Sequence, residues 1–254
     1  MIEIRTEETF QHLSRAPIVE AAIDIRARAT VELEEAPVRE QLESQLAEYT
    51  FLDSQRELQL ESTFTAGKPQ GQTVKDLGWQ AVRFQSRDAK HIVQVSKNGL
   101  VFSRLAPYTD WAHFLGEWLL MWNLFKTVGQ PAAIHRIGLR FINRIQLTEG
   151  EVKIDDYLNP APAAPCGFDL PFRGFFQHDV LGVPGHPYAM NVVRAIQPAT
   201  PGTGPGIILD IDVFTVDDAQ LEDRNLSTSL AEMRWLKNKV FFGSITEKTK
   251  SIYS

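Results

Sequence analysis

A single stretch decides the fold of this chain: His135-Arg136-Ile137-Gly138-Leu139-Arg140-Phe141-Ile142-Asn143-Arg144-Ile145. It alternates between apolar and polar residues, which is the pattern of a half-buried β-strand. One face of this strand carries the apolar residues Ile137, Leu139, Phe141 and Ile145. The other face, called the arginine face below, carries Arg136, Arg140 and Arg144. Three guanidinium groups on one sheet face require anions, which are either carboxylates of the same protein or a bound ligand.

Two further segments, residues 17–28 and 207–216, alternate in the same way and predict two more strands. Their polar faces carry carboxylates, which are Glu20 and Asp24 in the first segment and Asp210 and Asp212 in the second. Opposite charges that face each other across strands are common, and each pair contributes about 0.2–1 kcal/mol. These carboxylates are therefore candidate partners for the arginine face.

The charge pattern supports two interpretations of the arginine face. In the first, the arginines and the strand carboxylates form a structural ladder of salt bridges. In the second, Arg136, Arg140 and Arg144 bind a small anionic molecule on a concave sheet face, with Glu20 and Asp24 at its edge. The sequence leaves the choice between them open.

Local signals predict a hairpin and a long helix in the first half of the chain. Asn98-Gly99 joins two alternating segments and is a strong hairpin turn signal. Residues 111–128 read as a helix that Thr109 or Asp110 caps and Gly129 ends. Apolar residues cover most of the circumference of this helix, so we expect it to be buried nearly all round, by a curved sheet or by a second subunit.

The remaining segments complete a mixed fold. We expect helices over residues 32–49 and from Ser227 or Thr228 to Phe242, a loop over residues 67–71, and a long irregular excursion over residues 158–187. Further strands are predicted at residues 56–65, 79–86 and 188–196. The fold class is therefore α+β, with a curved antiparallel sheet and helices packed on one face. We expect one domain over residues 1–254, with a possible duplication of residues 16–129 as 130–254.

Composition narrows the cellular setting and the partners. The chain has 254 residues, 43% of them hydrophobic, and a formal net charge of −6. This negative charge disfavours nucleic acid as a partner. A single cysteine, an N-terminus without an apolar signal core and the lack of a long apolar run predict a soluble cytoplasmic protein that does not enter a membrane.

Two motifs offer possible catalytic chemistry. Asp210 and Asp212 stand two residues apart on one strand, a spacing that metal-dependent phosphoryl-transfer enzymes use to hold Mg²⁺. His178 and His186 lie in the same region as the single cysteine, Cys166, and together they form a weaker candidate for a nucleophile and its base. Neither pattern is specific by itself, so the catalytic residues stay unassigned and no cofactor is predicted beyond this Mg²⁺ alternative.

Four segments together resemble a known protein family along the whole chain. They are Pro17-Ile18-Val19-Glu20-Ala21, Phe102-Ser103-Arg104 with Tyr108 and Trp111, Arg136 to Arg144, and Phe242-Gly243-Ser244-Ile245-Thr246-Glu247-Lys248-Thr249. The chain resembles a sporadically distributed family of uncharacterised bacterial and archaeal proteins of about this length. The resemblance implies a prokaryotic origin and carries no catalytic residues to this sequence.

The sequence favours a non-catalytic binding or assembly protein over an enzyme. A broad sheet, an apolar helix and an aromatic-rich excursion are ingredients of a homo-oligomer or of a subunit in a larger complex. In this interpretation the arginine face is able to hold an anionic ligand. The alternative is a metal-dependent enzyme acting on a phosphate ester or nucleotide, in which Asp210 and Asp212 hold Mg²⁺ and the arginines hold phosphate.

Overall fold

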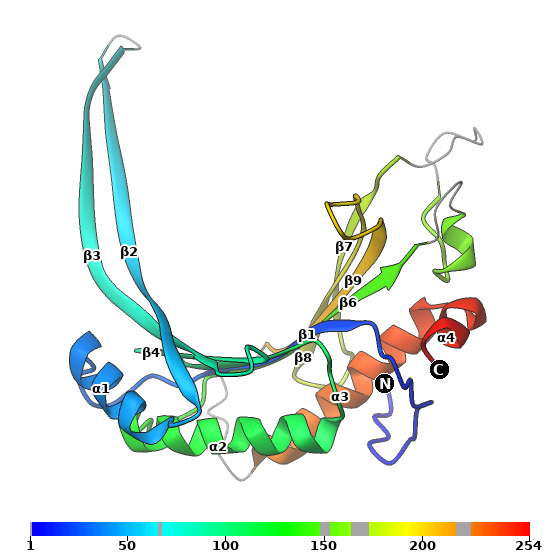
Figure 1. Ribbon diagram of the computed structural model, residues 1–254, viewed down its shortest axis with the longest axis horizontal. Coiled ribbons are helices and arrows are strands. Elements are labelled where there is room, and N and C mark those ends of the chain that lie inside the picture. The colour runs from blue at the N-terminus through cyan, green and yellow to red at the C-terminus, as the bar shows by residue number, and fades with distance from the viewer. Residues whose placement is uncertain (1, 66–67, 148–152, 164–172, 217–224) are drawn as a thin grey trace.

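One antiparallel sheet of nine strands organises the molecule (Figure 1), with the strand order β2-β3-β4-β5-β1-β6-β9-β8-β7. The computed structural model describes residues 2–65, 68–147, 153–163, 173–216 and 225–254. The strands are β1 (Ile18–Arg26), β2 (Tyr49–Thr65), β3 (Lys68–Ser86), β4 (His91–Ser96), β5 (Gly99–Leu105), β6 (Arg136–Gln146), β7 (Phe176–Gly182), β8 (Tyr188–Gln197) and β9 (Gly206–Thr215). The helices are α1 (Glu35–Gln45), α2 (Trp111–Gly129), α3 (Leu226–Ser244) and α4 (Glu247–Tyr253), with a 3-10 turn at Ile154–Asp156. The predicted α+β class is confirmed.

The stretch that decides the fold forms β6 at the centre of the sheet, between β1 and β9. Its apolar face is fully buried, as are Ile23 and Ile25 of β1, because α2 and α3 lie below this side of the sheet in Figure 1. The hairpin predicted at Asn98-Gly99 joins β4 to β5. Gly99 has a φ of +145° and approaches Ile25 so closely that a Cβ atom would meet the Ile25 carbonyl oxygen. Only glycine fits this crossing.

Helix α2 follows the predicted bounds closely, and Asp110 caps it by accepting a hydrogen bond from the His113 backbone N–H at 2.8 Å. Trp118 is completely buried and stacks on Trp122 with ring centroids 6.3 Å apart. The prediction of a helix buried nearly all round is wrong, however, because Leu120 is 66% exposed. The helix is thus packed on one side and open to solvent on the other.

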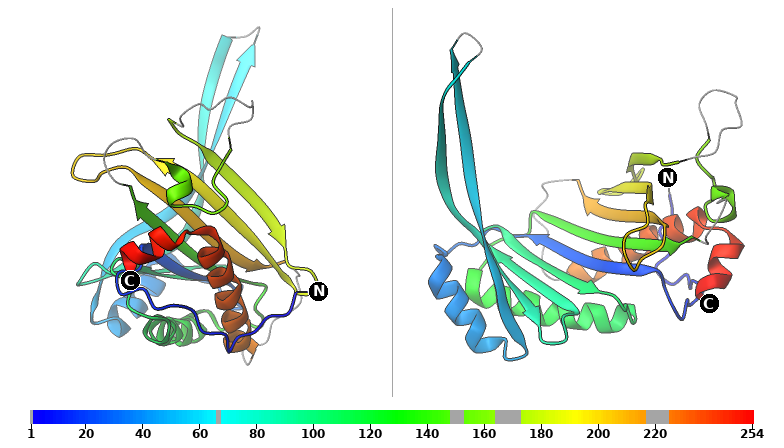
Figure 2. Two further views of the ribbon diagram at one scale, coloured as in Figure 1. Left: turned by 90° about the vertical axis from the view of Figure 1, so that its right-hand side faces the viewer. Right: turned by 45° about the horizontal axis from the view of Figure 1, so that its top comes forward.

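The β2–β3 hairpin is much longer than the two short strands predicted for it. Residues 68–71, predicted as a loop, pair with residues 63–65 at the far end of the hairpin. Only residues 81–85 of β3 pair with β4, so residues 56–65 and 68–80 form a two-stranded ribbon, called the arm below. Figure 2 shows the arm projecting away from the rest of the sheet. At about 3.3 Å per residue, it extends roughly 40 Å.

At the other end of the sheet, β8 and β9 lie where strands were predicted, whereas the edge strand β7 was not predicted. Residues 158–187, predicted as irregular, contain strand β7, which is an edge strand paired to β8. Helix α1 is shorter than predicted, and its last residue, Gln45, is followed by a turn into β2. Thr246 caps the last helix, α4, because its side-chain oxygen accepts a hydrogen bond from the Thr249 backbone N–H. No helix in the described part of the chain is long and apolar enough to cross a lipid bilayer.

Candidate functional site

The arginine face meets carboxylates on both neighbouring strands. Arg136 binds Asp24 of β1 through Nη1 at 2.9 Å, and its Nη2 lies 3.9 Å from the Asp212 carboxylate of β9. Its guanidinium carbon also lies 4.9 Å from the centroid of the Phe214 ring. Arg136 therefore lies between a carboxylate of β1 and a carboxylate of β9, and its guanidinium group also contacts an aromatic ring.

Gly138 explains how Arg136 reaches across the sheet. This glycine pairs with Asp24 on one side and with Phe214 on the other. A Cβ atom at position 138 would lie 3.1 Å from Arg136 Nη1 and 3.6 Å from the Cβ of Asp24. The missing side chain thus leaves room for the ion pair, which gives a physical reason for a glycine inside a central strand.

Arg140 forms the most complete ion pair of the arginine face. Its Nε and Nη2 atoms donate to both carboxylate oxygens of Asp210 at distances from 2.6 to 3.2 Å. This hydrogen bonding raises the pKa of the Arg140 guanidinium above its usual value. This bidentate geometry fixes the orientation of the Asp210 carboxylate more strongly than a single hydrogen bond would.

Arg144 differs from the other two arginines because the groups that accept its hydrogen bonds are neutral. Its Nε and Nη1 atoms donate to the side-chain carbonyls of Gln197 and Gln146, each at 2.6 Å, and its Nη2 donates to the Gly204 backbone carbonyl. Arg144 thereby ties the β8–β9 connection to β6. It makes no ion pair with the described residues.

Glu20 and Asp24, predicted at the edge of an anion site, have different roles. Glu20 accepts a hydrogen bond from the Ser103 hydroxyl of β5 at 2.8 Å, whereas Asp24 pairs with Arg136. Burial raises the pKa of Asp24, and the Arg136 charge acts in the opposite direction. Burial also raises the pKa of Asp212, against a hydrogen bond from Asn191 and the charge of Arg136.

The geometry brings together Asp24, Arg136, Asp212, Arg140 and Asp210 across three adjacent strands. These contacts agree with the salt-bridge ladder, since Arg136 and Arg140 already face carboxylates of the same protein. The predicted Mg²⁺ pair faces an added obstacle, because Arg140 occupies both oxygens of Asp210. Within the described ranges, no group of three or more His, Cys, Asp and Glu side chains has metal-binding geometry.

The histidine and cysteine candidates are not brought together in the described structure. His178 lies on β7 with Nε2 3.3 Å from the Asn191 side-chain oxygen. The His186 Nε2 lies 2.8 Å from the Ile2 carbonyl oxygen. Cys166 falls outside the described residues. The two histidines therefore have separate polar partners.

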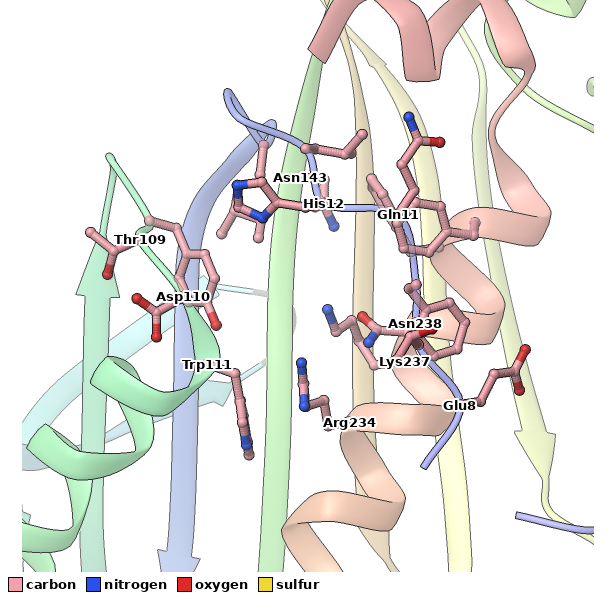
Figure 3. A pocket seen from close by; sticks show the side chains of 18 of the residues that line it. Glu8, Gln11, His12, Thr109, Asp110, Trp111, Asn143, Arg234, Lys237 and Asn238 are labelled. Carbon is pink, nitrogen blue, oxygen red and sulfur yellow. The ribbon is translucent and has the colours of Figure 1, made fainter. Parts of the chain in front are cut away.

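A second feature is a cavity of about 350 Å³ on the helix side of the sheet. The N-terminal segment 6–13, the start of α2, strand β6 and helix α3 surround it. Figure 3 shows Arg234 and Lys237 extending from α3 toward β6 and the start of α2, while Glu8 points away from them. The main polar side chains lining it are Tyr108, Asp110, Asn143, Arg234, Lys237 and Asn238.

Lys237 is the unusual residue of this cavity. Only 8% of it is exposed, and its Nζ lies 4.0 Å from the centroid of the Phe141 ring. Burial, reinforced by the positive charge of Arg234, lowers the pKa of Lys237 to about 7. Among the described residues, no carboxylate forms an ion pair with it. A buried lysine without a counter-ion is costly, which makes it a candidate functional residue.

The sequence carries a signal for Lys237 that lies outside the catalytic motifs considered above. The final helix carries an apolar stripe of Leu230, Met233, Leu236 and Val240, and Lys237 lies within that stripe at helical spacing. A charged residue on the buried face of a helix contradicts the hydrophobic pattern. Such a local contradiction marks a position where function or strain outweighs packing.

Comparison with known proteins adds no further guide to the site. No protein-family model matches the sequence, and a search of curated proteins finds no match either. The family resemblance carried by the motifs therefore stays a prediction.

Proposed function

We propose that this protein is a non-catalytic assembly protein, and that it forms a homo-oligomer through the arm. The observation that carries the proposal is an apolar stripe on the arm, formed by Leu58, Leu60 and Val74. These side chains are 62%, 58% and 60% exposed. Leu60 pairs directly with Val74, and Leu58 stands two residues before Leu60, so all three share one face of the ribbon.

The opposite face of the arm is polar, which makes the ribbon amphipathic. Glu57, Gln59, Glu61 and Lys75 alternate with the apolar residues along the two strands. An isolated two-stranded hairpin is at best marginally stable in water, so an arm of this length gains from a surface that covers its apolar face. Burying each of the three exposed side chains would contribute about 1–2 kcal/mol.

The surface that can cover the apolar face of the arm is the edge strand β7 in a second copy of the chain. Phe176 and Val180 of β7 are 73% and 65% exposed. They alternate with His178 on one face of an edge strand whose outer backbone groups have no neighbouring strand among the described residues. One chain thus carries both an apolar arm and an apolar edge, and a two-fold dimer would form this contact twice.

The test is the oligomeric state of three proteins by sedimentation velocity. We expect the wild type to be a dimer and the variant Leu58→Gln/Leu60→Gln/Val74→Gln to be a folded monomer. The control variant Glu57→Gln/Glu61→Gln/Lys75→Gln changes the polar face and should stay dimeric. A wild type that is monomeric at sub-millimolar concentration would refute the proposal, as would a dimeric apolar-face variant.

A cross-link tests which surfaces meet. Leu60→Cys protein and Val180→Cys protein, both carrying Cys166→Ser, are mixed and oxidised. We expect a disulfide-linked pair that contains one copy of each. Mixing Gln59→Cys protein with Val180→Cys protein is the control, because Gln59 lies on the polar face of the arm. Equal cross-linking from both faces would contradict docking of the apolar face.

We further propose that the chain has two similar halves, with the helices of both halves packed on one face of the sheet. The strand order supports this division. In residues 16–129, β1 pairs with β5, the last strand of the meander that precedes α2. In residues 130–254, β6 pairs with β9, the last strand of the meander that precedes α3. The two leading strands pair with each other antiparallel, so we expect a pseudo-two-fold axis between β1 and β6.

A further inference from the structure

We propose that the cavity beside Lys237 is a binding site for a small organic carboxylate, whose anionic group lies between Lys237 and Arg234. This inference is independent of the assembly proposal, since the cavity lies on the helix side of the sheet and shares no residue with the arm or β7. Its volume of about 350 Å³ is at the lower end of the range for ligand pockets.

The charges around the cavity favour an anion. Lys237 and Arg234 both line it, and neither forms an ion pair within the described residues. The acids that line it have other contacts or are exposed: Asp110 caps α2, Glu8 binds Lys239 and the Trp235 indole, and Glu7 faces solvent. Arg234 and the protonated form of Lys237 therefore lack the counter-charge that a bound carboxylate would supply.

A neutral donor completes the proposed anion site. Tyr108 lines the cavity, and its hydroxyl lies within the electrostatic influence of both Arg234 and Asp110. Burial holds the pKa of Tyr108 above its usual value, so the hydroxyl keeps its proton at neutral pH. It can then donate a hydrogen bond to a carboxylate oxygen.

The rest of the cavity suits the body of an organic acid better than inorganic phosphate. Aromatic rings line much of the wall, and Phe10 stacks on Phe242 there with centroids 5.5 Å apart. The polar walls include Asn143, which is 2% exposed and held by a 2.9 Å hydrogen bond to the Leu209 carbonyl, and Asn238. A single negative charge also meets less repulsion from Asp110 than a doubly charged phosphate would.

Thermal unfolding with three probes tests the inference: benzoate, hexanoate and inorganic phosphate. We expect at least one carboxylate, at ten times its dissociation constant, to raise the melting temperature of the wild type by about 3–6 °C. The matched control Lys90→Met removes a lysine outside the cavity whose side chain is 41% exposed, and it should keep this shift, whereas Lys237→Met should lose it. The inference is overturned if neither carboxylate shifts the wild type, if only phosphate does, or if Lys237→Met keeps the shift.

A second measurement avoids any dependence on the folding of Lys237→Met. Trace labelling of the wild type with acetic anhydride, read by peptide mass spectrometry, reports the reactivity of each lysine amine. A carboxylate seated against Lys237 should lower the reactivity of that amine by several-fold and leave Lys90 unchanged. Unchanged reactivity of Lys237 at saturating benzoate and hexanoate would count decisively against the site.

Discussion

The guanidinium group of Arg140 donates two hydrogen bonds to the Asp210 carboxylate, with Nη2 2.6 Å from Oδ2 and Nε 2.9 Å from Oδ1. The Asp210 side chain is 13% exposed, whereas that of Arg140 is 51% exposed, so solvent weakens the pair. A double-mutant cycle with Arg140→Ala and Asp210→Asn should give a coupling free energy of about 1 kcal/mol in urea unfolding.

The matched comparison is a helical ion pair that is exposed on both sides. Arg39 and Glu43 lie one turn apart on α1 with 2.8 Å between them. The same cycle with Arg39→Ala and Glu43→Gln should give about 0.3–0.5 kcal/mol. If the coupling free energy of Arg140 with Asp210 is no larger than this, the pair stabilises the fold no more than an exposed ion pair does, and the salt-bridge ladder is contradicted.

Added Mg²⁺ distinguishes the ladder from the metal-dependent enzyme. Because Arg140 occupies Asp210 and Arg136 lies beside Asp212, we expect millimolar Mg²⁺ to leave the melting temperature of the wild type unchanged. The Arg136→Ala/Arg140→Ala variant exposes both carboxylates and is the control in which a shift is expected. A Mg²⁺-dependent increase in the wild type that Asp210→Asn abolishes would favour the enzyme alternative.

Removing Arg136 should destabilise the protein in a pH-dependent way. Burial raises the pKa values of Asp24 and Asp212, and Arg136 opposes this rise in both. Without Arg136 both folded-state pKa values rise further above the unfolded values. An acid with a raised folded-state pKa contributes stability below its unfolded pKa and loses that contribution as pH increases through its folded-state pKa.

The expected result for Arg136→Met is a loss of about 1–3 kcal/mol at pH 7 and a smaller loss at pH 4, measured by urea unfolding. The expected loss of stability at pH 7 is kept small because solvent screens these charges: about a fifth to a third of each side chain is exposed. Arg26→Met serves as the control, since Arg26 is 63% exposed and lies 3.9 Å from Asp24. An equal loss at both pH values would contradict the electrostatic explanation.

Elements whose signals are local were predictable from the sequence. The period-two pattern of β1, β6 and β9 identifies strands, and the turn at Asn98-Gly99 places the hairpin between β4 and β5. The alternating charges also offered Asp24, Asp210 and Asp212 as candidate partners of the arginine face, and Arg136 and Arg140 lie beside these carboxylates. Such features depend on neighbours in sequence or on complementary charge.

Elements that depend on long-range context were missed. Strand β7 has only a weak pattern of its own and is held by pairing with β8. The distal arm carries Pro69, Gly71 and Gly78, which signal a loop in isolation, yet these residues pair with β2 along the ribbon. The cavity joins Tyr108, Asn143 and Lys237, which are far apart in sequence, so no spacing rule could reveal it.

Two residues of α2 test its one-sided packing. Trp118 is completely buried against Trp122, whereas Leu120 is 66% exposed. Trp118→Ala should cost about 3–5 kcal/mol, because it opens a large cavity in the core. Leu120→Ala should cost less than about 0.5 kcal/mol. Chemical denaturation of both variants checks this, and a large loss for Leu120→Ala would mean that a second subunit covers the outer side of α2.

Lys237 should make the ligand-free protein more stable as pH increases. A lysine in an ion pair, whose folded-state pKa is raised, would have the opposite effect. Burial and the Arg234 charge lower its folded-state pKa to about 7, from 10.5 for an unperturbed lysine. Between these values the unfolded chain binds more protons than the folded protein, so the free energy of unfolding increases with pH. The penalty for burying the ammonium group is therefore largest at and below pH 7.

Lys237→Met removes the titrating group while keeping a long side chain in place. We expect the variant to be more stable than the wild type at pH 6–7, and the difference to shrink by about 1 kcal/mol per pH unit between pH 7 and pH 9. Urea unfolding at four pH values measures this difference, with Lys90→Met as the control whose curve runs parallel to that of the wild type. A parallel curve for Lys237→Met would mean that the amine keeps an ordinary pKa in the folded protein.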